Sequence, residues 1–196
     1  MLTTKIITLL IILIFYITYL TKMFIQNKHG IKTDQMGKGN KPKKTLLIEI
    51  ILKIFTYSII VIELISIILK DKNNLVVFVI GTIFSFIGVI IFIISIITMK
   101  DSWRAGIQNK EKTNLITNRI YKISRNPAFL GFYLLYIGVL ISFFNIIHLI
   151  FVVITISILH LQILQEELFL EKTFKDEYLN YKKKTRRYLG IKFRGK

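Results

Sequence analysis

The sequence lacks cysteine, has only two prolines, and carries 11 acidic residues against 28 lysines and arginines among 196 residues. Without thiols, the chain has no disulfide and no cysteine-based zinc or iron–sulfur site. Hydrophobic residues make up 53% of the chain and the mean hydropathy is +0.57, which excludes a disordered protein. His29, His148 and His160 are not spaced to bind a metal together, so we expect no metal partner.

Five apolar segments are long enough, or nearly so, to cross a hydrocarbon core about 30 Å thick. They cover residues 6–25, 46–69, 75–99, 128–143 and 146–164. The very short connection at Asn145 indicates that the last two form a helical hairpin, whose first arm is short for a span. No small-residue cleavage site follows the first segment, which favours a retained helix over a signal peptide. The sequence therefore predicts an all-α integral membrane protein with about five transmembrane helices.

The basic residues are concentrated in three stretches, 28–44, 100–125 and 172–196, and the alternate connections are nearly free of charge. With five spans, these stretches lie on one side of the membrane. The positive-inside rule makes that side cytoplasmic and places the N-terminus outside, and we expect the membrane to be the cell membrane. The net charge of +17 is then a topology signal with added attraction to membrane lipids, and nucleic acid is not an expected partner.

Several polar or small residues lie inside the spans. Glu63 is well inside the second span, where it either contacts a polar group of a substrate or is protonated and bonded to a neighbouring helix. Glu49 is near the end of the same span, where we expect it to reach water. Gly81, Ser85 and Gly88 share one face of the third span, which predicts either close helix packing or a crevice for a ligand.

The region after residue 100 carries the chemically informative residues. Pro127 opens the fourth helix, whose free first-turn N–H groups could face a ligand. Glu166 and Glu167 lie where the fifth helix leaves the membrane. They either bind a cationic ligand, such as a sulfonium or ammonium group, or join a structural network with nearby arginines. The candidate arginines are Arg104, Arg119 and Arg125. Beyond the glutamates, apolar residues recur every three or four positions, which predicts a C-terminal amphipathic helix on the membrane surface or over a site.

A series of short motifs follows in a fixed order. It comprises Leu115-Ile116-Thr117, Tyr121, Arg125-Asn126-Pro127, Leu130-Gly131, Glu166-Glu167, Leu170, Phe174, Tyr178, Tyr181 and Arg187-Tyr188-Leu189. This series resembles the isoprenylcysteine carboxyl methyltransferase family, which is related to the phospholipid methyltransferases. The resemblance covers roughly residues 100–190, and it implies methyl transfer from S-adenosyl-L-methionine in a membrane-embedded site.

The resemblance also implies which residues contact the cofactor. They are Thr113, Asn114, Leu115, Ile116, Tyr121, Asn126, Pro127, Ala128, Phe129 and Glu166. The chain departs from the family pattern at four positions: Asn126 replaces a histidine, Arg119 and Lys175 each replace a glycine, and Gln162 stands where the family can carry an arginine that contacts the substrate carboxylate. Gln162, which stands at that position, and Glu63, which lies inside the second span, are the candidate substrate-binding residues.

The proposed chemistry requires no metal and no nucleophilic side chain, because the protein aligns the acceptor with the methyl group and excludes water. A carboxylate acceptor needs no general base, whereas a phenol or an amine needs one. We expect a lipophilic acceptor from the bilayer, such as an isoprenylcysteine-like carboxylate, an isoprenoid or a lipid. In this interpretation residues 1–99 form a three-helix transmembrane scaffold, and residues 100–196 form the cofactor-binding loop, the hairpin and the tail of the catalytic region.

Two other functions are compatible with parts of the sequence. A membrane reductase on a related scaffold, using a nicotinamide cofactor on a lipid, also carries an Arg-x-Pro loop, but it has an acidic residue where Phe132 follows Gly131 here. A non-catalytic membrane protein leaves the motif series and the paired glutamates without a role.

Overall fold

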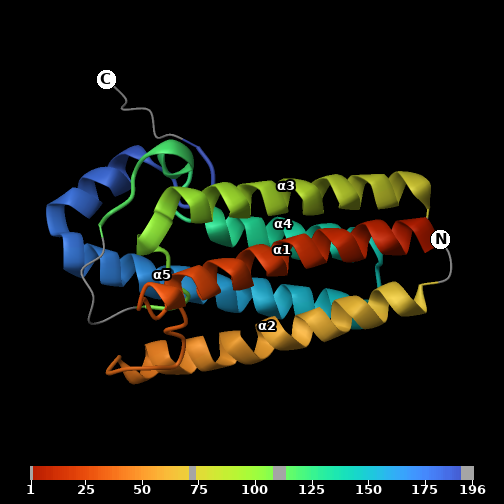
Figure 1. Ribbon diagram of the computed structural model, residues 1–196, viewed down its shortest axis with the longest axis horizontal. Helices are drawn as coiled ribbons and strands as arrows, with labels where there is room; N and C mark the ends of the chain where they lie inside the picture. The colour runs from red at the N-terminus through yellow and green to blue at the C-terminus, as the bar shows by residue number, and fades with distance from the viewer. Residues whose placement is uncertain (1, 71–73, 108–113, 191–196) are drawn as a thin grey trace.

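The computed structural model describes residues 2–70, 74–107 and 114–190, and in these residues the fold is a bundle of five α-helices without a β-strand (Figure 1). The helices are α1 (Leu2–Lys28), α2 (Lys43–Leu69), α3 (Leu75–Met99), α4 (Pro127–Ser142) and α5 (Ile146–Lys184), with short 3₁₀ turns η1 (Lys100–Ser102) and η2 (Arg119–Lys122). Four of the helices are long and apolar enough to cross a membrane, and α4 is shorter. The prediction of an all-α membrane protein is confirmed.

Side chains at the helix starts satisfy backbone N–H groups that have no partner within the helix. The side chain of Asn74 accepts hydrogen bonds from the first turn of α3, and that of Asn145 does the same for α5. Pro127 occupies the first turn of α4, where no N–H is required. The predicted hairpin of the fourth and fifth helices therefore has a defined start at each arm.

Helices α3 and α4 approach so closely that their backbones touch. A Cβ atom added at Gly88 would lie 2.7 Å from the carbonyl oxygen of Gly131, and one at Gly138 would lie 2.5 Å from that of Gly81. Ser85 is buried at the same contact and its hydroxyl donates to the carbonyl of Leu135. Because the lipid is as apolar as the side chains, such close contact is the main source of helix association in a bilayer. The predicted packing role of this face is confirmed.

Aromatic and polar side chains make contacts between the other helices. Helix α1 packs on α3 through the stacked rings of Phe15 and Phe92, whose centroids are 4.2 Å apart. Helix α2 runs along α5, and at one end Thr45 donates a hydrogen bond to Gln165. Helices α1 and α2 each have a partner elsewhere in the bundle, and a cavity lies between them.

Helix α5 continues past the predicted span and bends at Lys175, so the expected tail helix is its last part. Lys175 has φ 43° and ψ −120°, which no right-handed helix contains. After the bend, Tyr178 and Tyr181 are buried against Tyr121 of η2. The tail therefore folds back onto the connection between α3 and α4, as Figure 1 shows.

Two of the positive-φ residues stand where the family pattern that the sequence resembles has glycine. Arg119 has φ 50° and Lys175 has φ 43°. A side chain at positive φ crowds the backbone, whereas glycine adopts this conformation without penalty. The chain thus keeps a backbone shape that suits glycine while it carries long basic side chains.

We predict that Gly138→Ala destabilises the protein by about 1–3 kcal/mol, because the added methyl group overlaps the backbone of α3. Thermal unfolding in detergent, followed by circular dichroism, measures the loss. Ile83→Ala, at an exposed position of α3, serves as the control and should change the melting temperature little. Equal melting temperatures for wild type and Gly138→Ala would contradict the backbone contact.

The bend at Lys175 leads to a second prediction. Lys175→Gly should stabilise the protein by about 1 kcal/mol, since it removes the strain of a positive φ at an exposed side chain. Lys172→Gly, in regular helix three residues earlier, should instead destabilise by about 1 kcal/mol. If both glycines lower the melting temperature, the bend is not at Lys175.

Candidate functional site

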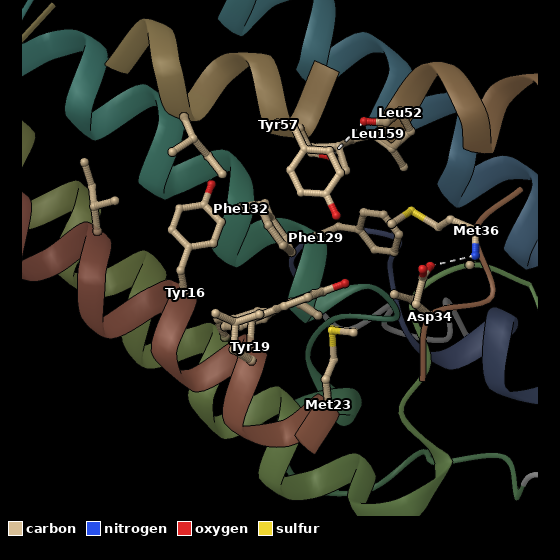
Figure 2. A pocket seen from close by; sticks show the side chains of 18 of the residues that line it. Tyr16, Tyr19, Met23, Asp34, Met36, Leu52, Tyr57, Phe129, Phe132 and Leu159 are labelled. Atoms are coloured by element: carbon tan, nitrogen blue, oxygen red, sulfur yellow. Dashed lines mark hydrogen bonds between the residues drawn. The ribbon is translucent and has the colours of Figure 1, made fainter. Parts of the chain in front are cut away.

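A cavity of about 720 Å³ lies between α1 and α2 and is closed at the back by α4 and α5. Its walls are mostly aliphatic and aromatic, and Figure 2 shows Tyr16 and Tyr19 of α1 facing Tyr57 of α2 across it. Along α1 the lining runs from Ile6 to Met23, about 25 Å at the helical rise. The cavity is therefore long, narrow and apolar over most of its length.

Polar groups gather at the end of the cavity that lies beside the basic connections, which we call the basic end. Gln162 and Glu166 of α5 line it together with Asp34 and Arg104 from the connections that follow α1 and α3. The amide of Gln162 donates a 3.0 Å hydrogen bond to Glu166. The carbonyl oxygen of the same amide is buried and has no partner among the residues that the structure describes. Two acceptor groups are thus offered to a ligand here.

The protonation of Glu166 is poised near neutrality. Glu166 follows the apolar part of α5, which ends at residue 164, and its side chain is half-buried. Burial raises the pKa of Glu166 to about 7, although the hydrogen bond from Gln162 lowers it. A cationic ligand at this carboxylate would favour its ionised form.

The neighbouring carboxylate, Glu167, is not among the cavity-lining residues and has several charged and polar partners. It accepts hydrogen bonds from Arg125 Nη2 at 2.8 Å, from Arg187 Nη2 at 2.9 Å and from the Asn126 amide at 3.1 Å. Burial raises the pKa of Glu167, but the hydrogen bonds and charges of Arg187 and Arg125 lower it by more than burial raises it. The pKa of Glu167 therefore lies below its ordinary value. Of the two alternatives raised for the paired glutamates, the structural network holds for Glu167. Binding of a cationic ligand stays a prediction for Glu166, which lines the cavity.

The segment after α5 completes this network. The Arg125 guanidinium donates to the carbonyl of Thr185, and its backbone N–H donates to the carbonyl of Arg186. The Tyr188 hydroxyl contacts the ring of His160 on α5. The tail is therefore anchored to the start of α4 and to α5. Of the arginines considered from sequence, Arg125 is the one that pairs with Glu167, and Arg187 is the partner that sequence reasoning missed.

The predicted cofactor residues fall into two neighbouring groups. Ala128, Phe129 and Glu166 line the basic end of the cavity, as does the predicted substrate residue Gln162. Leu115, Ile116 and Tyr121 pack instead in a cluster with Tyr178 and Tyr181. Tyr121 lies within electrostatic reach of Glu166, so the two groups adjoin.

Four further predicted residues take different positions. Pro127 and Asn126 are buried at the start of α4, where the Asn126 side chain donates to Glu167 and to the carbonyl of Arg187. Asn114 is exposed, and Thr113 lies outside the described residues. Direct cofactor contact stays a prediction for all ten residues.

The connection after α1 contributes to the site in a way that the sequence did not reveal. Glu49 was expected to reach water, but its side chain is fully buried. It accepts a hydrogen bond of 2.6 Å from Lys41 and further bonds from the backbone N–H groups of Gly37 and Ile107. One carboxylate thus joins the connection after α1 to the connection after α3. Because burial of Glu49 depends on groups 12 and 58 residues away, no local pattern signals it.

The same two connections form a short parallel contact. Asp34 bridges Ala105, and the N–H of Gln35 donates to the carbonyl of Ala105 at 2.8 Å. Gln26 at the end of α1 donates to the carbonyl of Trp103 at 3.1 Å. These contacts place Asp34 at the mouth of the cavity, where Figure 2 shows it beside Met36.

The fold and the cavity define a multi-pass helical membrane protein with an internal apolar site whose polar groups lie at the basic end. Residues 78–172, from α3 into α5, match the isoprenylcysteine carboxyl methyltransferase family, which supports the assignment of this region to that family. The match confirms the resemblance seen in the sequence and supports a membrane methyltransferase. It begins earlier than expected, within α3, and ends before the tail motifs at Phe174. No curated protein matches the chain.

The two adjacent glutamates give a matched pair of variants. Glu167→Gln should destabilise the protein by about 3–5 kcal/mol, because it leaves the buried Arg125 without its counter-charge. Glu166→Gln should leave the melting temperature unchanged or raise it, since it removes a carboxylate whose burial is poorly compensated. Thermal unfolding of both variants in detergent tests the assignment, and equal losses of stability would contradict it.

Proposed function

We propose that this protein transfers a methyl group from S-adenosyl-L-methionine to a lipophilic acceptor that enters the cavity from the bilayer. The observation that carries the proposal is the half-buried carboxylate of Glu166 at the polar end of a long apolar cavity. The match of residues 78–172 to a methyltransferase family supports it.

The chemistry of the side chains at the basic end suits this cofactor. S-adenosyl-L-methionine carries a sulfonium and an ammonium group, and its methyl group is the one transferred. Glu166 offers a negative charge to a cation, and the buried carbonyl oxygen of Gln162 offers an acceptor to an N–H or O–H donor. Phe129 and Ala128 supply apolar surface beside them. No metal is required by this donor set.

The chain's own residues position the reactants and exclude water. Glu166 holds the positively charged ligand, and Gln162 orients Glu166 through their hydrogen bond. The network on Glu167 keeps α5 and the start of α4 in fixed register, so Glu166 and Phe129 stay on the same wall. Such alignment of donor and acceptor supplies most of the catalysis in a displacement that needs no acid or base.

The acceptor reaches the site between α1 and α2. Leu10 and Leu13 of α1 and Tyr57 of α2 line the cavity and are also exposed, in a bundle whose surroundings are lipid. A lipophilic chain can therefore slide into the cavity with its reactive end toward Gln162 and Glu166. An isoprenylcysteine-like carboxylate, an isoprenoid or a lipid has the lipophilic chain that this entry requires.

The basic end faces the cytoplasm in this proposal, where the cofactor is available, and the N-terminus lies outside the cell membrane. The lysines and arginines near Lys28, Lys43 and Lys100 all lie at this end of the bundle, as the positive-inside rule requires of the cytoplasmic side.

The test is calorimetric binding of S-adenosyl-L-methionine to the full chain in detergent. Glu166→Gln should weaken binding at least about tenfold, as expected for the loss of a charge-assisted contact. Glu177→Gln, at an exposed position of the tail, should bind as wild type does. A labelled-methyl assay with membrane lipids and prenylated cysteine analogues then identifies the acceptor.

A pH profile sharpens the same comparison. Because burial raises the pKa of Glu166 to about 7, its ionised fraction falls as the pH drops below this value. The affinity of the wild type should then fall by about tenfold per pH unit, whereas the affinity of Glu166→Gln should not follow this slope. Absence of binding by folded wild type would contradict the proposal, and binding of a nicotinamide cofactor would favour a reductase.

A further inference from the structure

One basic residue, Arg104, lines the cavity among the residues that the structure describes. It belongs to the connection after α3 and lies at the basic end, whose lining also includes Gln162 and Glu166. The Arg104 side chain is half-buried, and its Nη1 donates hydrogen bonds to the backbone carbonyls of Asp101 and Trp103. These bonds restrict the orientation of a guanidinium group that is placed beside an apolar cavity.

The backbone that carries Arg104 is also fixed by contacts with distant segments. The N–H of Ala105 donates to the carbonyl of Thr33 at 3.0 Å. The N–H of Ile107 donates to the buried carboxylate of Glu49 at 2.8 Å. A charged group on a backbone held in this way loses little freedom when it binds a ligand, which favours affinity.

The acidic residues near Arg104 are poorly suited to act as a general base. Asp34 lines the cavity, but its carboxylate accepts hydrogen bonds of 2.9 Å from both Lys38 and Lys53, which favour its ionised form and make it a weak base. Glu166 holds the positively charged ligand in the proposed function. Glu63, the other candidate substrate residue, has no exposed surface and is not among the cavity-lining residues.

These environments favour an acceptor that arrives already ionised. An amine or a phenol must lose a proton to react, whereas a carboxylate needs no base. A carboxylate in apolar surroundings does need a counter-charge, because its burial without one is costly. Gln162 is uncharged, so among the described lining residues Arg104 is the one that can supply a positive charge.

We infer that Arg104 binds the ionised carboxylate head of the lipophilic ligand and thereby selects it over an uncharged ester or alcohol with the same chain. A guanidinium can offer a carboxylate two parallel N–H donors, which gives strength and direction. The identification of this ligand with the methyl acceptor rests on the proposed function, whereas binding of the anion at Arg104 does not.

The proposed transfer makes the same contact useful for product release. A carboxylate oxygen attacks the methyl carbon, the carbon–sulfur bond breaks with its electron pair going to sulfur, and no proton moves. The product is a neutral ester and a neutral thioether. Because the ester carries no charge, it loses the ion pair with Arg104 and should bind more weakly than the acid.

The first experiment uses the single tryptophan of the chain, Trp103, which lines the cavity next to Arg104. The probes are α-bromododecanoate and its methyl ester, because a bromine atom close to an indole ring quenches its fluorescence. The full chain in detergent is titrated at about pH 6. There the bromine-substituted acid is ionised, and Glu166, with a pKa of about 7, is mostly protonated and does not repel it.

Wild type should reach half-saturation at an acid concentration about tenfold below that for the ester, as expected for a charge-assisted contact. Arg104→Met should lose this preference and still bind the ester as wild type does. Arg104→Lys should keep a smaller preference, because it retains the charge without the two parallel donors. The control is Lys32→Gln, at an exposed position outside the cavity lining, which should keep the full preference.

Three results of these titrations would overturn the inference. They are equal half-saturation of wild type by the two probes, an acid preference that survives Arg104→Met, and a loss of ester binding by Arg104→Met. The last result would mean that Arg104 shapes the cavity and does not select the charge.

The second experiment decides between two anions, because S-adenosyl-L-methionine also carries a carboxylate. In calorimetry, Arg104→Met should bind this cofactor as tightly as wild type does. Weaker cofactor binding by Arg104→Met would assign the guanidinium to the cofactor and overturn the inference.

These results also separate the inference from the proposed function. The bromine-substituted probes require no cofactor, so an acid preference in a wild type that binds no S-adenosyl-L-methionine retains the anion site and rejects the methyltransferase. Cofactor binding at Glu166 without an acid preference does the reverse.

Discussion

The ion pairs on Glu167 hold together the parts of the chain that form the basic end. One buried carboxylate joins α5, the start of α4 and the segment after α5, through Arg125, Asn126 and Arg187. Removing a carboxylate from water is unfavourable unless charged and hydrogen-bonding partners replace the solvent. Here the partners come from positions 42 and 20 residues away, so the folded tail and the register of the hairpin are conditions for burying the charge.

The other buried glutamates differ in how completely protein groups replace the solvent around the carboxylate. Glu49 has a lysine and two backbone N–H groups, and it joins two connections. Glu166 has one amide donor, and Glu63 has no partner among the described residues. An incompletely partnered carboxylate lowers stability, so the position of Glu166 in the cavity lining favours a role in ligand binding over a role in the fold.

The sequence was sufficient for those features that depend on local pattern. The apolar runs gave the five helices, Asn145 and Pro127 marked the ends of the hairpin, and the small residues at positions 81, 85 and 88 predicted the face that packs. The sequence was insufficient where the hydrogen-bonding partners of a buried carboxylate lie far away along the chain. Glu49 and Glu167 look alike in sequence to Glu166, yet their partners lie in distant connections that only the folded chain brings together.

The bend in α5 is an intermediate case. The family resemblance indicated that position 175 usually holds a glycine, but a lysine there obscured the reason, which is a positive φ. The amphipathic pattern of the tail was visible, whereas its burial partner was not, because Tyr121 lies on a 3₁₀ turn far earlier in the chain.

The cavity itself follows from how helices associate in lipid. Within a bilayer no hydrophobic force closes a gap between two apolar helices, because lipid chains are as apolar as leucine. Helices α3 and α4 close their gap with glycines, but α1 and α2 face each other with large residues such as Leu13 and Tyr57. Each of these two helices is held by another partner, and the carboxylate of Glu49 ties together the connections next to them only at the basic end. The space between α1 and α2 therefore stays open along the bundle, and a lipophilic chain can fill it at little cost.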